Sequence, residues 1–86
     1  MFELEIVIQN PTGLHARPAA QLSALCKSFP NTITLTSGER KANPKSIFSL
    51  LSGCFVKGDT VRVGVEGENA QEVAEKIAAF IQTLED

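Results

Sequence analysis

The chain has 86 residues, 43% of them hydrophobic and 21% charged, which predicts one globular domain over residues 1–86. Eight Lys and Arg residues against ten Asp and Glu give a net charge of −2, which supplies no positive field for nucleic acid and argues against that class of partner. The N-terminal residues lack the basic and apolar regions of a secretory signal, and no apolar run approaches the ~20 residues that cross a bilayer. A cytoplasmic protein without membrane insertion is expected.

Residues 2–8 alternate, with every even position apolar, and this pattern predicts a strand with one buried face. The next four residues, Asn10-Pro11-Thr12-Gly13, all favour turns and predict a loop that leads to His15. From Ala16 to near Pro30 the chain predicts an amphipathic helix. Its apolar positions are Ala19, Leu22, Cys26 and Phe29, and the polar positions between them are Gln21, Ser23 and Lys27.

Residues 32–36 alternate again, and the turn at 37–39 predicts a hairpin with a short strand over 40–43. Pro44 and Ser46 then begin a helix of two turns at most, which contains Ile47, Leu50 and Leu51 and ends at Gly53. Residues 60–65 form a further alternating strand whose odd positions point inward.

The last predicted helix begins after Asn69 as N-cap, with Glu72 in its first turn, and runs nearly to the end of the chain. Its apolar stripe consists of Val73, Ile77, Phe80, Ile81 and Leu84. The predicted order is β-α-β-β-α-β-α. Single-sided strands favour an α+β fold, an open-faced β-sandwich in which three helices cover one face of a four-stranded antiparallel sheet.

His15, the only histidine, lies where the first loop meets the first helix. The first amides of a helix lack internal partners and carry the positive end of the helix dipole, so an anion on His15 would meet donors such as the Ala16 amide. Pro18 fits the first turn because it needs no hydrogen bond there. Arg17 adds a permanent charge that can stabilise phosphoryl oxygens. The same dipole disfavours the imidazolium, which leaves a neutral ring able to attack phosphorus.

This spacing alone is equally compatible with a histidine that only caps the helix and an arginine that is only a solvated charge. Cys26 and Cys54 form no C-x-x-C pair and cannot complete a four-ligand zinc site with His15, so we expect reduced thiols and no metal.

The sequence Gly-Leu-His-Ala-Arg-Pro-Ala at 13–19, with Lys45-Ser46-Ile47 and the element order, resembles the HPr family over nearly the whole chain. These proteins are small phosphocarriers of the phosphoenolpyruvate-dependent sugar phosphotransferase system. The resemblance implies that enzyme I phosphorylates His15 at Nδ1 and that the group passes to enzyme IIA. It further implies a monomeric carrier that is a substrate of other phosphotransferases, without a cofactor or metal of its own.

The resemblance also implies a regulatory phosphoserine at Ser46, made by a kinase and phosphorylase, although a serine is equally favoured there as an N-cap. Phe48 and Leu51 are candidates for partner docking, and plain core packing is the alternative for both. The chain departs from the family at Gly53-Cys54, where Leu-Gly is usual. The departure predicts an earlier helix end, an altered loop and an exposed, oxidisable Cys54.

Three other functions fit the same residues. A regulatory paralogue, nitrogen-related or of the catabolite-control kind, would share His15 without serving sugar uptake. An enzyme of acylphosphatase type would hydrolyse acyl phosphates without forming phosphohistidine. A regulatory domain that binds a small anion at the helix start would form no covalent adduct.

Overall fold

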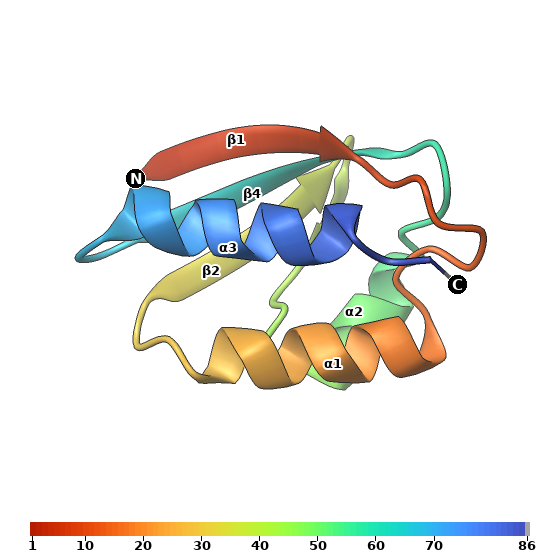
Figure 1. The fold of residues 1–86 in the computed structure, drawn as a ribbon, viewed down its shortest axis with the longest axis horizontal. Coiled ribbons are helices and arrows are strands. Elements are labelled where there is room, and N and C mark those ends of the chain that lie inside the picture. The colour runs from red at the N-terminus through yellow and green to blue at the C-terminus, as the bar shows by residue number, and fades with distance from the viewer. Residues whose placement is uncertain (86) are drawn as a thin grey trace.

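The computed structural model describes residues 1–85, and its elements follow the predicted order (Figure 1). The strands are β1 (Phe2–Val7), β2 (Thr32–Ser37), β3 (Arg40–Ala42) and β4 (Thr60–Glu66), and the helices are α1 (Ala16–Lys27), α2 (Ile47–Gly53) and α3 (Ala70–Gln82). No helix within residues 1–85 is long and apolar enough to cross a membrane.

The four strands form one antiparallel sheet in the order β1-β4-β2-β3. Val63 of β4 pairs with Leu4 on one side and Leu35 on the other, so the apolar positions of these strands share one face. The odd positions of β4 point inward as predicted, with Val61, Val63 and Val65 fully buried.

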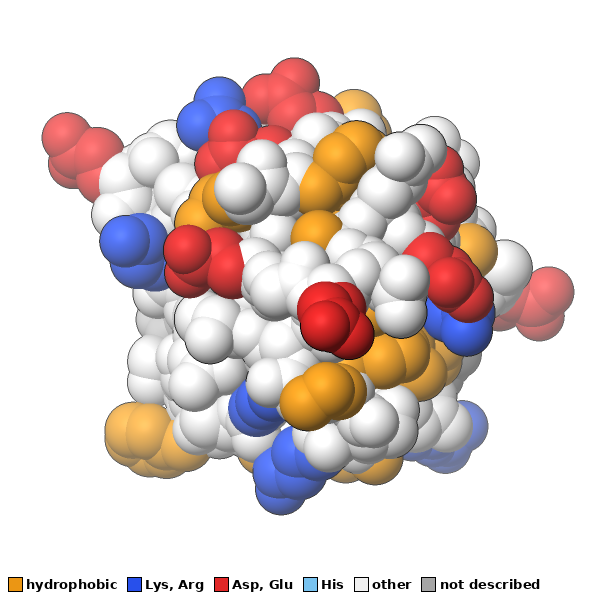
Figure 2. Space-filling view, turned by 90° about the vertical axis from the view of Figure 1, so that its left-hand side faces the viewer, with side chains coloured by type: hydrophobic (Ala, Val, Ile, Leu, Met, Phe, Trp, Pro, Cys, Tyr) orange, Lys and Arg blue, Asp and Glu red, His pale blue; other side chains and the backbone are white. Residues whose placement is uncertain are grey.

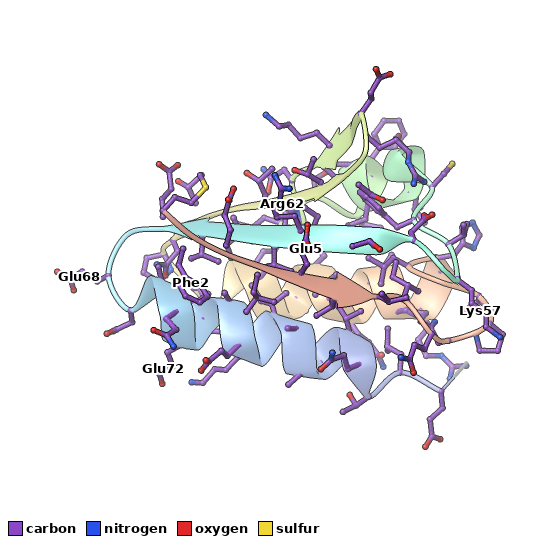
Figure 3. The ribbon with its side chains drawn as sticks, turned by 90° about the horizontal axis from the view of Figure 1, so that it is seen from above. Phe2, Glu5, Lys57, Arg62, Glu68 and Glu72 are labelled. Atoms are coloured by element: carbon purple, nitrogen blue, oxygen red, sulfur yellow. The ribbon has the colours of Figure 1, made fainter. Side chains whose placement is uncertain are left out.

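Figure 3 shows α1 and α3 on one side of the sheet and the opposite face open. Glu5 and Arg62 lie on that open face, where their side chains form a solvent-exposed ion pair at 3.5 Å. The third helix, α2, packs against α1 and β3. The predicted open-faced α+β sandwich is confirmed.

Two local predictions are wrong in detail. Asn69 does precede α3, but it adopts a left-handed conformation with φ of 57° and its side chain makes no capping hydrogen bond. Ser23, predicted on the polar face of α1, is buried. Its hydroxyl donates to the carbonyl of Lys45 at 3.0 Å, while Lys45 Nζ donates to Phe29 O beyond the end of α1 at 2.7 Å. The chain before α2 therefore covers part of α1 that the sequence pattern leaves exposed.

The predicted end of α2 at a glycine C-cap differs from the structure at Gly53-Cys54. Gly53 is still helical, and the following Cys54 takes the left-handed conformation that ends α2, with φ of 50°. Gly53 is required for another reason: a Cβ there would lie 2.5 Å from the ring of the buried Phe55. The missing side chain at 53 thus makes room for the aromatic ring two residues later. Cys54 is exposed, as predicted.

Cys26 on α1 is fully buried, and loss of solvation raises the pKa of its thiol from 9.0 to about 12 although the charge of Lys45 opposes this shift. The pKa of Cys26 is higher in the folded than in the unfolded chain. The contribution of the protonated thiol to the free energy of unfolding is therefore complete below about pH 9 and is lost as pH rises toward about 12. We expect the free energy of unfolding to fall by up to about 1.4 kcal/mol per pH unit in this window. Urea unfolding at pH 8 to about 11 measures the slope.

Cys26→Ala removes this titration and should flatten the alkaline slope, whatever its effect on stability at neutral pH. Cys54→Ala is the matched control, because it removes an exposed thiol. Equal slopes in the two variants would show that burial of Cys26 does not cause the alkaline loss.

Candidate functional site

Asn10 stabilises the loop between β1 and α1 by hydrogen bonds to Gly13. Asn10 is only 3% exposed, its Nδ2 donates to Gly13 O at 2.9 Å, and its own carbonyl accepts from the Gly13 amide at 3.2 Å. Gly13 has a φ of 64°, a region that favours glycine. The turn predicted from composition is therefore present, and the buried amide side chain of Asn10 is a scaffold element that sequence reasoning missed.

The same loop is fixed to the segment that follows α2. The Leu14 amide donates to Phe55 O at 2.9 Å, and the Leu14 side chain is buried in the core. Gly13 lies so close to this segment that a Cβ on it would be 2.4 Å from Phe55 O. Two main-chain contacts therefore fix the residues immediately before His15.

His15 is the N-cap of α1, with an extended backbone (φ −125°, ψ 155°) and an exposed side chain. His15 occupies the predicted capping position, but its imidazole makes no capping hydrogen bond to the helix. The first turn of α1 also contains no acidic residue. The positive end of the dipole is thus not neutralised from within the helix, which favours a negatively charged group at His15.

The residues after His15 complete the start of α1. Ala16 has a φ of 48°, in the left-handed region that costs a residue with a Cβ about 1–3 kcal/mol. Arg17 is exposed and Pro18 is buried in the first turn. No feature of the sequence indicates the unusual backbone of Ala16, since alanine ordinarily avoids this region.

The residues predicted at α2 for regulation and docking differ in their surroundings. Ser46 is the N-cap, and its Oγ accepts from the Ser49 amide at 3.2 Å. Phe48 is 80% exposed, whereas Leu51 is half-buried and packs against the core. Two further apolar residues, Ile47 and Val56, are exposed by 41% and 52%, and neither was predicted from the sequence to take part in docking.

In Figure 1 the β1–α1 loop, α2 and the last turn of α3 lie at the same end of the molecule. Figure 2 looks onto the opposite end, where no histidine is visible and charged side chains of both signs surround apolar patches. A cavity of about 460 Å³ is lined there partly by Glu68, Glu72 and Lys76. Two carboxylates and one ammonium do not form an anion site, so the largest hollow of those described is not where the phosphoryl chemistry would occur.

Within residues 1–85 no group of three or more His, Cys, Asp and Glu side chains is arranged to hold a metal ion. The site carries an exposed imidazole at the start of α1 and, two residues later, an exposed guanidinium.

Comparison with known proteins supports the same chemistry. A family profile described as "PTS HPr component phosphorylation site" matches residues 2–83. The chain belongs to the HPr family. It is 40% identical over 83 residues to phosphocarrier protein HPr of Haemophilus influenzae, an alignment that covers 96% of this chain and 95% of that protein.

Other HPr-family proteins are similar over nearly the whole chain. The HPr-like protein Crh of Bacillus subtilis is 35% identical over 82 residues, covering 95% of this chain and 96% of its own length. The crystal structure of HPr-C-His from Thermoanaerobacter tengcongensis superposes with a TM-score of 0.90 at 34% identity, covering 96% of this chain and 93% of that one. The chain therefore has the fold of the HPr family, a family of phosphocarrier proteins.

Proposed function

We propose that residues 1–86 form a single phosphocarrier domain that accepts a phosphoryl group on His15 from phosphorylated enzyme I and donates it to enzyme IIA. The observation that carries the proposal is the exposed His15 at a helix start whose first turn has no acidic residue. The phosphocarrier relatives support phosphoryl transfer in general. Enzyme I as donor and enzyme IIA as acceptor are what the resemblance to the HPr family implies.

In the proposed step the neutral Nδ1 of His15 attacks phosphorus in line with the histidine of enzyme I. One N–P bond forms as the other breaks, and the electron pair of the broken bond returns to the donor ring. The Ala16 amide and the Arg17 guanidinium stabilise the oxygens in transit, so catalysis is positioning and charge stabilisation. The acceptor then reverses the roles, and the chain is a substrate of its partner enzymes without a cofactor or metal of its own.

Incubation with enzyme I and phosphoenolpyruvate, followed by intact-mass measurement, tests the proposal. The expected product carries one phosphoryl group, which acid removes because an N–P bond is acid-labile. A chain that hydrolyses acyl phosphates, or that binds phosphate reversibly without a mass change, would favour the acylphosphatase type or the anion-binding domain instead.

Replacement of Arg17 by Gln is expected to slow transfer from phosphorylated enzyme I by about 10- to 100-fold without abolishing it. The variant keeps a polar side chain but loses the charge, and one charge-assisted hydrogen bond is worth about 1.5–3 kcal/mol. Rapid-quench measurement of phosphohistidine formation gives the rate. An unchanged rate would show that Arg17 does not stabilise the transferred group.

For docking we favour Phe48 over Leu51. Phe48 presents most of its ring to solvent at the surface of α2, whereas Leu51 contributes to the core. The exposed Ile47 and Val56 extend the apolar surface available to enzyme I and enzyme IIA.

The proposed carrier acts as a monomer in the cytoplasm.

Ser46 is proposed as a regulatory phosphorylation site for an HPr kinase/phosphorylase. As N-cap of α2 its oxygen already accepts a backbone hydrogen bond, so a phosphate there is compatible with the helix and would act by repelling partners at the neighbouring apolar surface. Incubation with ATP and such a kinase should give one acid-stable phosphoryl group that Ser46→Ala prevents. If the Ser46→Ala variant still gained an acid-stable phosphoryl group, the kinase would modify another residue.

A regulatory paralogue, nitrogen-related or of the catabolite-control kind, is the second candidate, since Crh is also a full-length relative. Phosphorylation by enzyme I without onward transfer to any enzyme IIA would favour it.

A further inference from the structure

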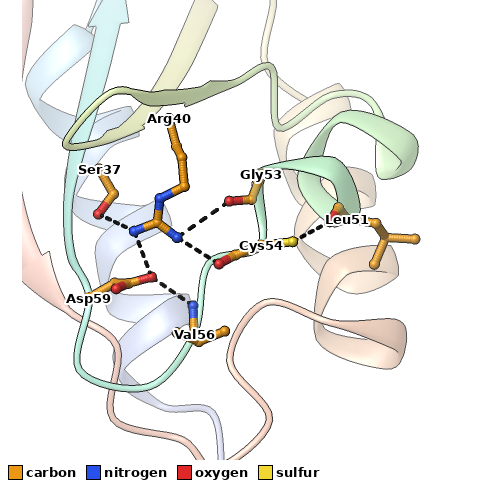
Figure 4. Close-up of polar contacts among 7 residues, drawn as sticks. All are labelled: Ser37, Arg40, Leu51, Gly53, Cys54, Val56 and Asp59. Atoms are coloured by element: carbon orange, nitrogen blue, oxygen red, sulfur yellow. Dashed lines mark hydrogen bonds and ion pairs between the residues drawn. The ribbon is translucent and has the colours of Figure 1, made fainter.

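Arg40 begins β3, and its guanidinium lies against residues 53–59, which we call the crossover segment because they join α2 to β4 (Figure 4). Nη1 donates to Cys54 O at 2.7 Å and to Gly53 O at 3.5 Å. Nη2 lies 3.0 Å from Asp59 Oδ2. One side chain therefore bonds to both ends of the crossover segment.

Additional contacts define the position of this guanidinium. Nη2 donates to Ser37 Oγ at 3.2 Å, and the guanidinium carbon lies 5.7 Å from the centre of the Phe55 ring. The same Oδ2 of Asp59 also accepts from the Val56 amide at 2.9 Å. The side chains of the ion pair are only 40% and 20% exposed, so solvent and salt screen it less than a fully exposed pair.

The crossover segment is also the surface on which the loop before His15 rests. Phe55 O accepts the Leu14 amide at 2.9 Å, and Ile8 exchanges main-chain hydrogen bonds of 3.0 and 2.8 Å with the same segment. Leu14 is the residue directly before His15, so the crossover segment fixes the chain on which the imidazole is carried.

We propose that Arg40, through Asp59 and the crossover segment, is a positioning residue for phosphoryl transfer at His15. This inference rests on the proposed function. The contacts of Arg40 are made to the crossover segment and Ser37, so its effect is on the geometry of the imidazole. In-line transfer is sensitive to such geometry, because a misplacement of about 1 Å can cost about 100-fold in rate.

The chemistry of the contacts requires arginine in particular. Two carbonyls, a hydroxyl and a carboxylate are arranged around the planar fork of donors. A lysine ammonium is a point charge and cannot reach all four groups from one position. Arg40→Lys should therefore recover only part of what Arg40→Met loses.

The test measures the initial rate of transfer from phosphorylated enzyme I over a range of carrier concentrations. Arg40→Met is expected to lower kcat about 10-fold with a smaller rise in KM, because the main loss is in alignment of the imidazole, while the crossover segment also carries Val56 of the proposed docking surface. Arg62→Met is the matched control: it removes an arginine of an exposed ion pair with Glu5 on the open face of the sheet, and both constants should stay at wild-type values.

A second measurement reports only whether Arg40 stabilises the hydrogen bond between the Leu14 amide and Phe55 O. Hydrogen exchange of the Leu14 amide should accelerate in Arg40→Met and stay unchanged in Arg62→Met, because Arg40, unlike Arg62, bonds to the segment that carries the acceptor of that hydrogen bond. This measurement needs no enzyme I.

Two results would overturn the positioning role: a wild-type kcat in Arg40→Met, or a loss that merely follows the unfolded fraction and disappears on cooling. Either result refutes the positioning role but leaves the proposed function standing, because the wild-type chain still transfers the phosphoryl group. A wild-type chain that accepts no phosphoryl group from enzyme I refutes the proposed function and, with it, the positioning role.

Discussion

Replacement of His15 by Ala is expected to abolish the acid-labile phosphoryl adduct completely while leaving the fold intact. His15 is the only histidine in the chain, so no second imidazole can accept the group. Its side chain is exposed and does not cap α1, so the free energy of unfolding should change by no more than about 0.5 kcal/mol. Intact mass before and after acid treatment gives the adduct, and urea unfolding gives the stability.

The comparison that makes this result specific is with the Arg17→Gln variant. That chain keeps the acceptor and should reach full phosphorylation slowly, whereas His15→Ala should stay unmodified at any time. An acid-labile adduct that persists in His15→Ala would move the acceptor to another residue and refute the proposed function.

Gly13→Ala is expected to destabilise the fold by at least about 3 kcal/mol and to slow phosphoryl transfer as well. Two costs combine: the positive φ of 64° penalises any Cβ by about 1–2 kcal/mol, and that Cβ would lie 2.4 Å from Phe55 O and 2.8 Å from Val56 Cα. Both of these atoms belong to the backbone, so relief requires the loop before His15 to move away from its support.

Gly38→Ala separates these two costs. Gly38 has nearly the same φ, 61°, but a Cβ there meets nothing within 4 Å. Only the conformational penalty of about 1–2 kcal/mol should remain, with wild-type transfer. Midpoints of urea unfolding at a constant m value give the comparison. Equal losses in the two variants would mean that close approach of Gly13 to the crossover segment contributes nothing.

The sequence by itself determined the secondary structure, the inward faces of the strands and the chemistry of residues 13–19. These features are local: alternation with a period of two, apolar stripes with helical spacing and turn-forming residues act over a few positions. For this reason Val61, Val63 and Val65 are buried as predicted and His15 lies directly before α1.

Only the tertiary structure decided which residues support the site. The burial of Ser23, the need for glycine at position 53 and the contacts of Arg40 all depend on segments that are distant in the sequence or on the space that a neighbouring ring occupies. Local patterns do not encode such contacts, because a polar residue looks the same in sequence whether it faces water or a carbonyl from another element. The acceptor could therefore be recognised from its neighbours in the chain, whereas its support required the packing of α2, β3 and β4 to be known.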